Sequence, residues 1–140
     1  MKNAKKGVGR PGKRRSKTLR VVRSFIRRIN EQDAEGLAGL MTAQHCFVDS
    51  GGNRYVGRQI MREGWRQYFS MFPGYRIEVE KIISSGTCAA VFGVTSAVCA
   101  KTGKSVRMPA AWLAKVSGGL MREWRVYADN DPARKALDDK

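Results

Sequence analysis

Apolar and polar residues in the first third of the chain follow the period of a helix. Apolar side chains recur every three or four positions: Leu19, Val22, Phe25, Ile26 and Ile29. A separate stripe of arginines has the same period: Arg20, Arg23 and Arg27. The pattern predicts an amphipathic helix with a buried apolar face and a basic outer face.

Two further helices are expected before the chain reaches residue 75. The segment Asn30 to Asp33 contains residues that end one helix and cap the next. The short helix after it has an apolar series: Leu37, Leu40 and Met41. Gly57 opens a third helix, and the Pro73-Gly74 pair ends it. The apolar face of the third helix is broad: Ile60, Met61, Gly64, Trp65, Tyr68, Phe69 and Phe72.

The rest of the chain has the pattern of a sheet. Four runs of strand length are separated by Ser-Gly, Thr-Gly and Gly-Gly turns: Tyr75 to Ile83, Cys88 to Ala100, Ser105 to Val116 and Leu120 to Asp129. This order favours an antiparallel meander. Helices followed by strands predict an α+β domain in which a curved, mostly antiparallel sheet wraps around the long helix and encloses an apolar pocket.

Length and charge divide the chain into a domain and two tails. A chain of 140 residues has the size of one domain. The net charge is +15, and residues 1–20 hold nine Lys or Arg and no acid. Residues 1–17 have too few large apolar side chains to offset their ordering entropy, so a disordered basic tail is expected there. The domain is placed at residues 18–132 and a polar C-terminal tail at 133–140.

The cysteines and the histidine indicate neither a disulfide framework nor a metal centre. Cys46, Cys88 and Cys99 are an odd number without paired spacing, and His45 is the sole histidine. We therefore expect no metal and no cofactor. No apolar run approaches the roughly 20 residues of a membrane helix, and no secretion signal follows the basic start. A soluble, cytoplasmic protein is expected.

Asp49 is the first candidate for chemistry. It follows the apolar run Cys46 to Val48 and precedes the turn Ser50 to Asn53. A carboxylate carried into an apolar interior without a cationic partner has a raised pKa and can act as a general base near neutral pH. The alternative is structural, because an Asp at this position also caps the turn into the Gly-Gly pair.

The basic tail points to a second class of partner. Gly9 to Pro11, followed by a basic cluster, resembles half of an AT-hook, a minor-groove-binding element whose first arginine is absent here. The candidate contacts to nucleic acid or another polyanion are Arg10, Lys13, Arg14 and Arg15. Such binding would depend strongly on salt. A purely solubilising arm is the alternative.

Short motifs in a characteristic order run from about residue 20 to residue 132. They are Asn30-x-x-Asp33, Leu37-x-x-Leu40, Phe47-Val48-Asp49, Gly57-x-x-Ile60, Trp65, Phe72-Pro73-x-Tyr75 and Glu123-Trp124-x-x-Tyr127-x-Asp129. Their order and spacing resemble the nuclear transport factor 2-like superfamily, in its SnoaL-like and ketosteroid-isomerase-like branch. The resemblance implies a cone-shaped roll, homodimers formed through the outer face of the sheet, and enzymes that act on hydrophobic small molecules.

The resemblance assigns roles to three positions. Ketosteroid isomerases have their general base at the end of the first strand, where Asp49 stands here. Phe25 takes the place of their donor tyrosine, and Ala111 that of their protonated aspartic acid. Neither donates a hydrogen bond, and losing one oxyanion donor typically costs about 2.7–4 kcal/mol of barrier. Steroid isomerisation is therefore not expected, while Phe25 and Ala111 remain candidate substrate contacts.

Aromatic residues supply the other pocket candidates. Trp65 and Tyr68 of the third helix are expected to line the pocket, with Trp124 closing it from the opposite side. Trp112 lies beside Ala110 and Ala111 in the sequence, and the pattern leaves two positions open to it: the pocket side of the sheet, or the outer face, where dimers form. The alternative for the helical aromatics is a core role, because a helix that covers a sheet needs such side chains for packing.

Other branches of the superfamily use other acids. SnoaL-type polyketide cyclases have an acidic residue on the pocket wall, and Asp49, Glu123 or Asp129 fits by type. Asp129 at a strand end also suits a turn cap. Limonene epoxide hydrolases use an Asp-Arg-Asp arrangement, for which Arg107 or Arg125 offers the arginine, although no spacing brings these residues together.

Two functional hypotheses follow. In the first, the protein binds a hydrophobic small molecule and is a cofactor-independent isomerase, cyclase or dehydratase with Asp49 as general base. In the second, it is a non-catalytic ligand-binding or dimerisation module that its basic tail tethers to nucleic acid or another polyanion. A homodimer is the expected assembly. The second hypothesis predicts salt-sensitive binding that disappears when residues 1–17 are removed.

Overall fold

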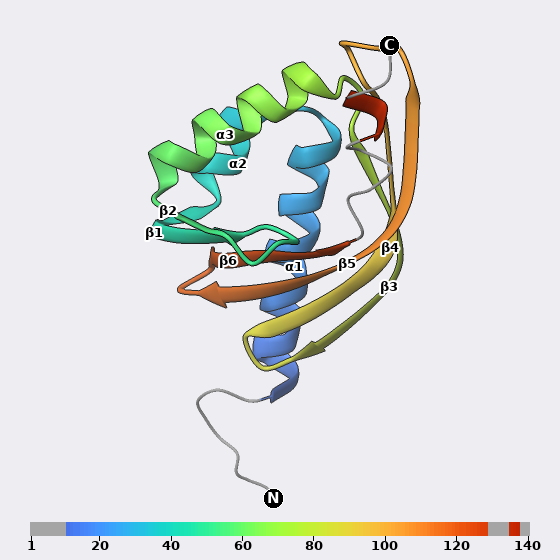
Figure 1. Ribbon diagram of the computed structural model, residues 1–140. Helices are drawn as coiled ribbons and strands as arrows, with labels where there is room; N and C mark the ends of the chain where they lie inside the picture. Colours follow the sequence, from blue (N-terminus) through green and yellow to red (C-terminus); the bar gives the residue numbers. More distant parts are fainter. Residues whose placement is uncertain (1–10, 129–134, 138–140) are drawn as a thin grey trace, which may run out of the picture.

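A curved sheet wraps around three helices in the computed structural model, which describes residues 11–128 and 135–137 (Figure 1). Two helices and two strands come first, then a third helix, then four consecutive strands. The predicted α+β class with a curved, mostly antiparallel sheet is confirmed. The helices formed by the described residues are all too short or too polar to span a membrane.

The first helix, α1 (Pro11–Asn30), buries its apolar stripe and exposes its arginines. Its fully buried side chains are Val22, Phe25 and Ile29. The predicted basic outer face is present, because the arginine stripe of residues 20, 23 and 27 is exposed. The amphipathic pattern therefore orients α1 correctly against the sheet.

The start of α1 differs from the expectation. The helix begins at Pro11, where a proline suits the first helical position because its fixed φ is helical and its missing N–H is not needed. Thr18 is buried, and its hydroxyl donates to the Gly86 carbonyl at 2.8 Å. The expected disordered tail of residues 1–17 is thus wrong for residues 11–17, and residues 1–10 lie outside the described part.

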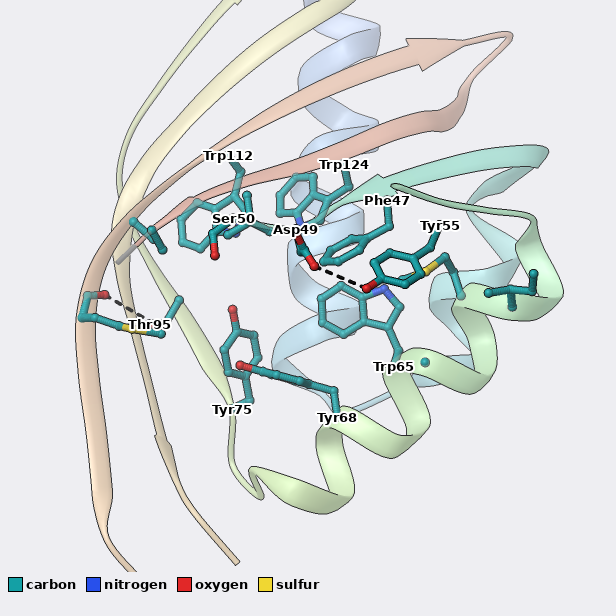
Figure 2. A pocket seen from close by; sticks show the side chains of 17 residues that line it. Phe47, Asp49, Ser50, Tyr55, Trp65, Tyr68, Tyr75, Thr95, Trp112 and Trp124 are labelled. Carbon is teal, nitrogen blue, oxygen red and sulfur yellow. Dashed lines mark hydrogen bonds between the residues drawn. The ribbon is translucent and has the colours of Figure 1, made fainter. Parts of the chain in front are cut away.

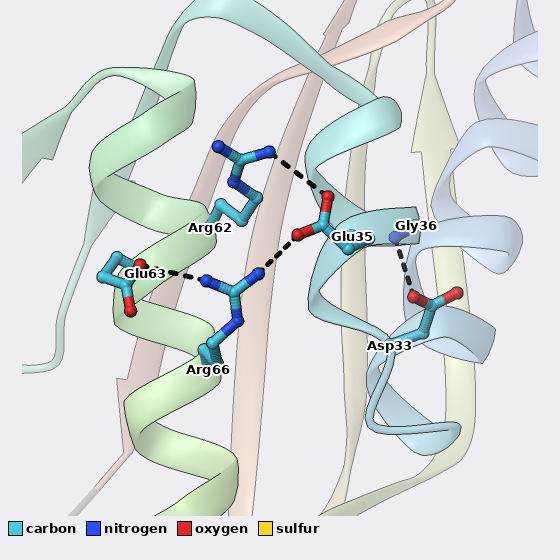
Figure 3. Close-up of polar contacts among 6 residues, drawn as sticks. All are labelled: Asp33, Glu35, Gly36, Arg62, Glu63 and Arg66. Atoms are coloured by element: carbon cyan, nitrogen blue, oxygen red, sulfur yellow. Dashed lines mark hydrogen bonds and ion pairs between the residues drawn. The ribbon is translucent and has the colours of Figure 1, made fainter.

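The second helix, α2 (Ala34–Gly39), begins at the predicted cap. The Gly36 N–H donates to Asp33 Oδ1 at 2.8 Å. Glu35 ties this helix to the next one by accepting from Arg62 at 3.2 Å and from Arg66 (Figure 3). Exposed ion pairs contribute only about 0–1 kcal/mol each, so this cluster sets orientation more than stability.

The third helix, α3 (Arg58–Met71), has glycines at both ends. Gly57 precedes it with a φ of 122°, and Gly74 follows it with a φ of 72°, both in the region that favours glycine. The helix buries Met61, Trp65 and Phe69. The predicted boundaries and apolar face of this helix are confirmed.

Six strands form one sheet in the order β2-β1-β6-β5-β4-β3. Their bounds are β1 (Met41–Val48), β2 (Arg54–Val56), β3 (Arg76–Ser85), β4 (Cys88–Val98), β5 (Ser105–Ser117) and β6 (Leu120–Ala128). All neighbours are antiparallel except β1 and β6, which are parallel. The four predicted C-terminal strands are confirmed. Met41, expected in the second helix, instead starts β1 opposite Met121.

The sheet bends where β3 approaches β4 most closely. The register of this pair shifts between Val79 and Lys81, as at a β-bulge. Opposite this shift, a Cβ on Gly93 would lie 2.1 Å from the Glu78 carbonyl oxygen, so no side chain fits there. Glycine at position 93 allows the close approach that curves the sheet toward the helices.

The core lies between α1, α3 and the concave face of the sheet. Trp112 and Trp124 stack with ring centroids 6.0 Å apart, and Phe25 packs on Trp124 at 5.0 Å. Ala136, in a helical turn at residues 135–137, is 4% exposed and joins this core. The expected polar tail of residues 133–140 is therefore packed at this point.

Candidate functional site

A cavity of about 370 Å³ lies between α3 and the concave face of the sheet (Figure 2). Seven aromatic side chains line it: Phe47, Tyr55, Trp65, Tyr68, Tyr75, Trp112 and Trp124. Among the described residues, Asp49 is the one charged residue of the lining, which contains no Lys, Arg or His. The lining therefore differs in charge from the rest of this chain, whose net charge is +15.

Strand β5 turns alternate side chains toward the cavity. Ala110 and Trp112 line it, and their partners on β6, Ala128 and Val126, line it too. Successive side chains of a strand point to opposite faces, so Ala111 faces the outside of the sheet. Trp112, whose face the sequence left open, therefore lines the cavity, whereas the candidate substrate contact Ala111 lies on the outer face away from it.

The tryptophans at positions 65 and 124 line the cavity as expected. Trp65 is 5% exposed and Trp124 is fully buried. Neither indole N–H has a hydrogen-bond partner among the described residues. An unpartnered buried donor typically costs about 1–3 kcal/mol, so both groups can gain from an acceptor that a bound molecule supplies.

Asp49 lies just after β1, and its carboxylate is held by its own turn. Oδ1 accepts from the backbone N–H groups of Gly51 and Asn53, both at 2.9 Å. Oδ2 accepts from Asn53 Nδ2 at 3.1 Å and from the Tyr55 hydroxyl at 3.4 Å, which Figure 2 shows as a dashed line. The residue therefore caps the turn and lines the cavity at the same time.

These bonds reverse the expected charge behaviour of Asp49. Partial burial alone would raise the pKa of the carboxyl, but the hydrogen bonds from Asn53, Gly51 and Tyr55 together outweigh it and lower the pKa. The prediction of a raised pKa is wrong because the turn that was considered as the structural alternative supplies these donors. Asp49 is consequently ionised at neutral pH.

Tyr68 and Tyr75 face the same cavity from α3 and from the residue before β3. Burial raises the pKa of Tyr68 to about 12 and raises that of Tyr75 well above its usual range. Their rings meet edge to face, with centroids 5.0 Å apart. Neither hydroxyl is hydrogen bonded to another described residue, and in Figure 2 the two lie across the cavity from Asp49. Both are neutral donors over the physiological pH range.

Tyr75 is a site residue that sequence reasoning missed. The pattern assigns it only to the start of a strand, because a long stretch of sequence separates it from Asp49. The available signal was the Pro73-Gly74 turn, which reverses the chain after α3 and brings Tyr75 back beside Tyr68. A turn after an aromatic helix face can place the next aromatic residue on the same cavity.

Phe25 lies in the core beside the cavity. It is fully buried, packs on Trp124, and is not part of the cavity lining. Its ring centroid is 6.0 Å from that of His45, whose Nδ1 lies 2.9 Å from the Met121 carbonyl oxygen. Burial lowers the pKa of His45, so the imidazole is neutral at neutral pH. The expected substrate contact of Phe25 is replaced by a supporting role beneath Trp124.

The other candidate acids and arginines are engaged elsewhere. Glu123 is buried, with Lys115 at 3.6 Å and Arg54 at 4.0 Å, and does not line the cavity.

The candidate arginines also have partners outside the cavity. Arg107 pairs with Glu78 at 3.7 Å. Arg125 lies over the ring of the exposed Tyr127, with its guanidinium carbon 5.1 Å from the ring centroid. Asp129 lies outside the described residues. The structure does not bring an Asp-Arg-Asp group together among the residues it describes.

The predicted polyanion contacts lie at the start of α1. Arg15 is exposed in the first turns of the helix. Lys13 and Arg14 belong to the same turns, but their side chains are not described, and Arg10 lies outside the described residues. The described side chain of Arg15 is not part of the cavity lining.

Many solved structures share this architecture, and the ones described below are distant from this chain in sequence. A protein from Jannaschia sp. CCS1 described as a SnoaL-like polyketide cyclase superposes with a TM-score of 0.83 at 15% identity, covering 96% of this chain and 99% of that one. An epoxide hydrolase of M. tuberculosis, described as LEH-like, superposes with a TM-score of 0.75 at 16% identity, covering 87% of this chain and 90% of that one. At this identity, the likeness shows the fold alone.

A third structure carries a bound molecule. A protein with a ketosteroid-isomerase-like fold from Catenulispora acidiphila, in complex with trimethylamine, superposes with a TM-score of 0.74 at 16% identity. The superposition covers 80% of this chain and 87% of that one. The comparison with curated protein sequences found no match.

The same α+β cone is seen in a protein from Burkholderia thailandensis described as NTF2-like, which superposes with a TM-score of 0.76 at 16% identity and covers 86% of this chain and 97% of that one. The model of the SnoaL-like domain family matches residues 22–124, which is most of the chain. The chain belongs to the SnoaL-like domain family, as the sequence motifs indicated.

Proposed function

We propose that the protein binds a hydrophobic small molecule with a carbonyl oxygen in its cavity, and that Asp49 acts on it as a general base. The observation that carries this proposal is the pairing of one ionised carboxylate with two neutral phenols on a single apolar cavity. Isomerisation, cyclisation and dehydration next to a carbonyl all begin with loss of a proton from carbon.

The proposed step is a proton transfer between carbon and oxygen. Asp49 Oδ2 takes the proton from the carbon next to the carbonyl, the C–H electron pair moves into the new C=C bond, and the carbonyl oxygen becomes an enolate. The O–H groups of Tyr68 and Tyr75 donate to that oxygen and stabilise its charge. From α3 and from the residue before β3, they supply the donors that positions 25 and 111 lack. The proton on Asp49 then returns to the product at another atom.

The pKa shifts define the pH range of this step. Asp49 must be ionised, so the acid limb lies below its ordinary pKa of 3.8, because the turn lowers that value. Tyr68 must keep its proton, so the alkaline limb extends toward about 12. A lowered pKa also makes Asp49 a weak base, which favours substrates whose C–H group is already acidic, such as those between two carbonyl groups.

The charge of the lining selects among ligands. Among the described residues, no Lys, Arg or His lines the cavity, while Asp49 is ionised and the other polar groups are aromatic or hydroxyl side chains. A neutral or cationic ligand is therefore favoured over an acid, since an anion would meet the carboxylate without a counter-charge. The trimethylamine complex of the Catenulispora acidiphila protein supports the view that this fold can hold a small amine.

Binding and chemistry can be tested separately. All three tryptophans of the chain line the cavity, so intrinsic fluorescence reports its occupancy directly. A panel of apolar 1,3-dicarbonyl compounds and cyclic enones would be screened by fluorescence. Proton exchange at carbon in D₂O, followed by NMR, would then detect the first chemical step without knowledge of the final product.

We expect Asp49→Asn to bind the ligand and to lose roughly 10²–10⁴-fold in exchange rate, because the base is removed. Tyr68→Phe and Tyr75→Phe are each expected to lose roughly 10²–10³-fold, as for an oxyanion donor. Exposed Tyr127, on β6, provides the matched control Tyr127→Phe, which should change neither quantity. Binding without exchange in the wild type would favour a non-catalytic ligand-binding module.

We also propose that two copies associate through the outer face of the sheet. Phe92, Ala111 and Tyr127 form a row across β4, β5 and β6, and the two aromatic residues are 41% and 49% exposed. The small Ala111 between them leaves room for a side chain of the second copy. Sedimentation should give a dimer that Phe92→Glu dissociates. A monomeric wild type would contradict this assembly.

The basic N-terminus supports a second candidate function, as a tether to nucleic acid or another polyanion. Exposed Arg15 and Lys17 precede Thr18, the first buried residue among those whose burial the structure describes, so these two cations at the start of α1 are not used in packing. Arg10, Lys13 and Arg14 add to it along the sequence. Binding that is lost when residues 2–10 are made neutral, with the cavity unchanged, would support this role.

A further inference from the structure

A groove of about 400 Å³ runs between α1 and β3, apart from the aromatic cavity. Its lining combines three arginines with apolar side chains of the helix and the strand. The arginines are Arg23, Arg27 and Arg76, and all are exposed. The apolar members are Ile26, Val79 and Ile82. No residue of this groove belongs to the candidate active site.

Side-chain hydrogen bonds hold the two sides of the groove together. Asn30 donates to the Ile77 carbonyl at 3.1 Å and accepts from the Ile77 N–H at 2.8 Å. Gln32 donates to the Tyr75 carbonyl at 2.7 Å. Both backbone neighbours of Arg76 are thus anchored to the end of α1. The guanidinium of Arg76 is presented beside the helix from a fixed backbone.

The charge in the groove is not compensated. Within residues 11–128 and 135–137, none of Arg23, Arg27 and Arg76 takes part in an ion pair. Glu31 is the acidic residue of the lining, and it pairs with Arg28 at 3.2 Å. Three guanidinium groups therefore face solvent around one concave surface. Such groups bind phosphate oxygens in bidentate geometry.

The arginines also extend beyond the size of one anion. Arg20, one turn earlier on the same stripe of α1, is exposed as well. From Arg20 to Arg27, the helix advances about 10 Å at 1.5 Å per residue, which is the length of several phosphates along a nucleic-acid strand. A linear polyanion matches this stripe better than a single phosphate does.

We propose that the groove between α1 and β3 binds the phosphodiester backbone of nucleic acid, with Arg23, Arg27 and Arg76 as phosphate contacts. The concave shape receives a strand, and the apolar lining covers the faces of sugars or bases. A membrane surface would instead require apolar side chains that protrude from a basic face. This site belongs to the folded domain and does not depend on the N-terminal tail or on the proposed chemistry.

The test is fluorescence anisotropy with the full-length protein. The probes are labelled single-stranded and duplex oligomers of about 20 nucleotides, as DNA and as RNA, titrated between about 50 and 200 mM salt. The groove variant combines Arg23→Ala, Arg27→Ala and Arg76→Ala. The matched control removes three exposed cations outside the groove: Lys101→Ala, Arg122→Ala and Lys135→Ala. A tail variant replaces Lys2, Lys5, Lys6 and Arg10 by Ala.

The groove variant is expected to weaken binding by at least about tenfold, and the slope of log K against log salt should fall by about 0.9 for each duplex phosphate that the protein no longer neutralises. The control should weaken binding by less than about threefold, because it removes only long-range attraction. Arg76→Gln alone should lower the slope by about 0.9, which gives a second measurement if the triple variant folds poorly. The difference between DNA and RNA probes identifies the nucleic acid.

Three results would overturn the proposal. The first is equal weakening of oligonucleotide binding in the groove variant and in the control variant, which would leave net charge as the explanation of binding. The second is loss of binding in the tail variant with none in the groove variant. The third is the absence of oligonucleotide binding at low salt together with groove-dependent binding to phosphatidylserine vesicles, which would assign the groove to a membrane surface.

Discussion

The two walls of the cavity treat their ionisable groups in opposite ways. On the acidic wall (Asp49 and Tyr55), hydrogen bonds that include those from the Asn53 turn behind it lower the pKa of a carboxyl. On the phenolic wall (Tyr68 and Tyr75), burial raises the pKa of two phenols. The acidic wall is built within a few residues of chain, whereas the phenolic wall joins a helix to the start of a strand.

The comparison shows that the same apolar surroundings do not shift all groups alike. Desolvation acts on both walls, but only Asp49 has nearby donors that outweigh it. The result is a charged group opposite neutral donors at neutral pH, which is the arrangement that the proposed proton transfer needs.

The largest expected effect comes from removing Trp124, a fully buried tryptophan of the cavity lining. Trp124 is fully buried and packs on Trp112 and Phe25, so Trp124→Ala should reduce the free energy of unfolding by about 3–5 kcal/mol. Urea denaturation measures this change. Arg122→Ala, at an exposed position on the same strand, is the control. Equal losses of stability in the two variants would contradict the supporting role of Trp124 in the packing of the cavity lining.

The acidic wall can be broken at Asp49. Asp49→Ala removes the acceptor for two backbone N–H groups and two side chains, and should reduce stability by about 1–2 kcal/mol at neutral pH. Because the folded state has the lower pKa, this contribution is present above the ordinary value of 3.8 and is lost as pH falls through the folded pKa. Urea denaturation at several pH values should show the two proteins converging in acid.

The lowered pKa of Asp49 also changes what is expected of Asp49→Asn. A buried carboxyl with a raised pKa would make Asp49→Asn neutral or stabilising at neutral pH. The structure instead predicts a loss of about 1 kcal/mol for Asp49→Asn, since its amide group would meet the Asn53 amide donor where Oδ2 now accepts. A stabilising Asn variant would contradict the turn geometry.

A smaller effect is expected from substituting Asn53, whose side-chain amide helps to lower the pKa of Asp49. Asn53→Ala keeps the backbone donor to Asp49 and removes the amide bond of 3.1 Å, so the pKa of Asp49 should move upward and stability should fall by about 0.5–1 kcal/mol. NMR titration of the Asp49 carboxyl carbon gives the pKa. Gln67→Ala removes an exposed amide on α3 and should leave that pKa unchanged.

The smallest effect at neutral pH is expected on the phenolic wall. Tyr68→Phe should change stability by less than about 0.5 kcal/mol, because the described residues offer its hydroxyl no hydrogen bond to lose. The folded pKa is raised, so wild-type stability is full below the ordinary value of 10.0 and falls as pH rises toward about 12. The Phe variant should lose less over this interval in alkaline urea titrations. If the stability of the two proteins fell equally with rising pH, burial would not raise the pKa of Tyr68 as proposed.

Much of the fold was predictable because its signals are local. The stripe of Val22, Phe25 and Ile29 defines the buried face of α1, and the Pro73-Gly74 pair marks where α3 ends. Turn residues and alternation located the four C-terminal strands. The start of α1 was not predicted, because composition alone does not reveal that a helix can include basic residues that precede its packed part. Among the residues whose burial is described, that packing begins at Thr18.

The site was less predictable because it depends on faces and partners. Asp49, Trp65, Tyr68 and Trp124 line the cavity as expected. The position of Ala111 was wrong by one residue, and such a shift on a strand exchanges the inside of the sheet for the outside. The face that a residue of β5 occupies depends on its register with the neighbouring strands β4 and β6. The sequence of a single strand does not specify that register.

By itself, the sequence determined the helical and strand segments, the SnoaL-like family and the excess of basic charge, because periodicity, turn residues and composition act over short distances. Only the tertiary structure decided the electrostatics of the cavity and the groove. It placed Tyr75 beside Tyr68, gave Asp49 the donors that lower its pKa, and set Arg76 next to α1. Those outcomes depend on contacts between distant segments and on the solvent that packing excludes.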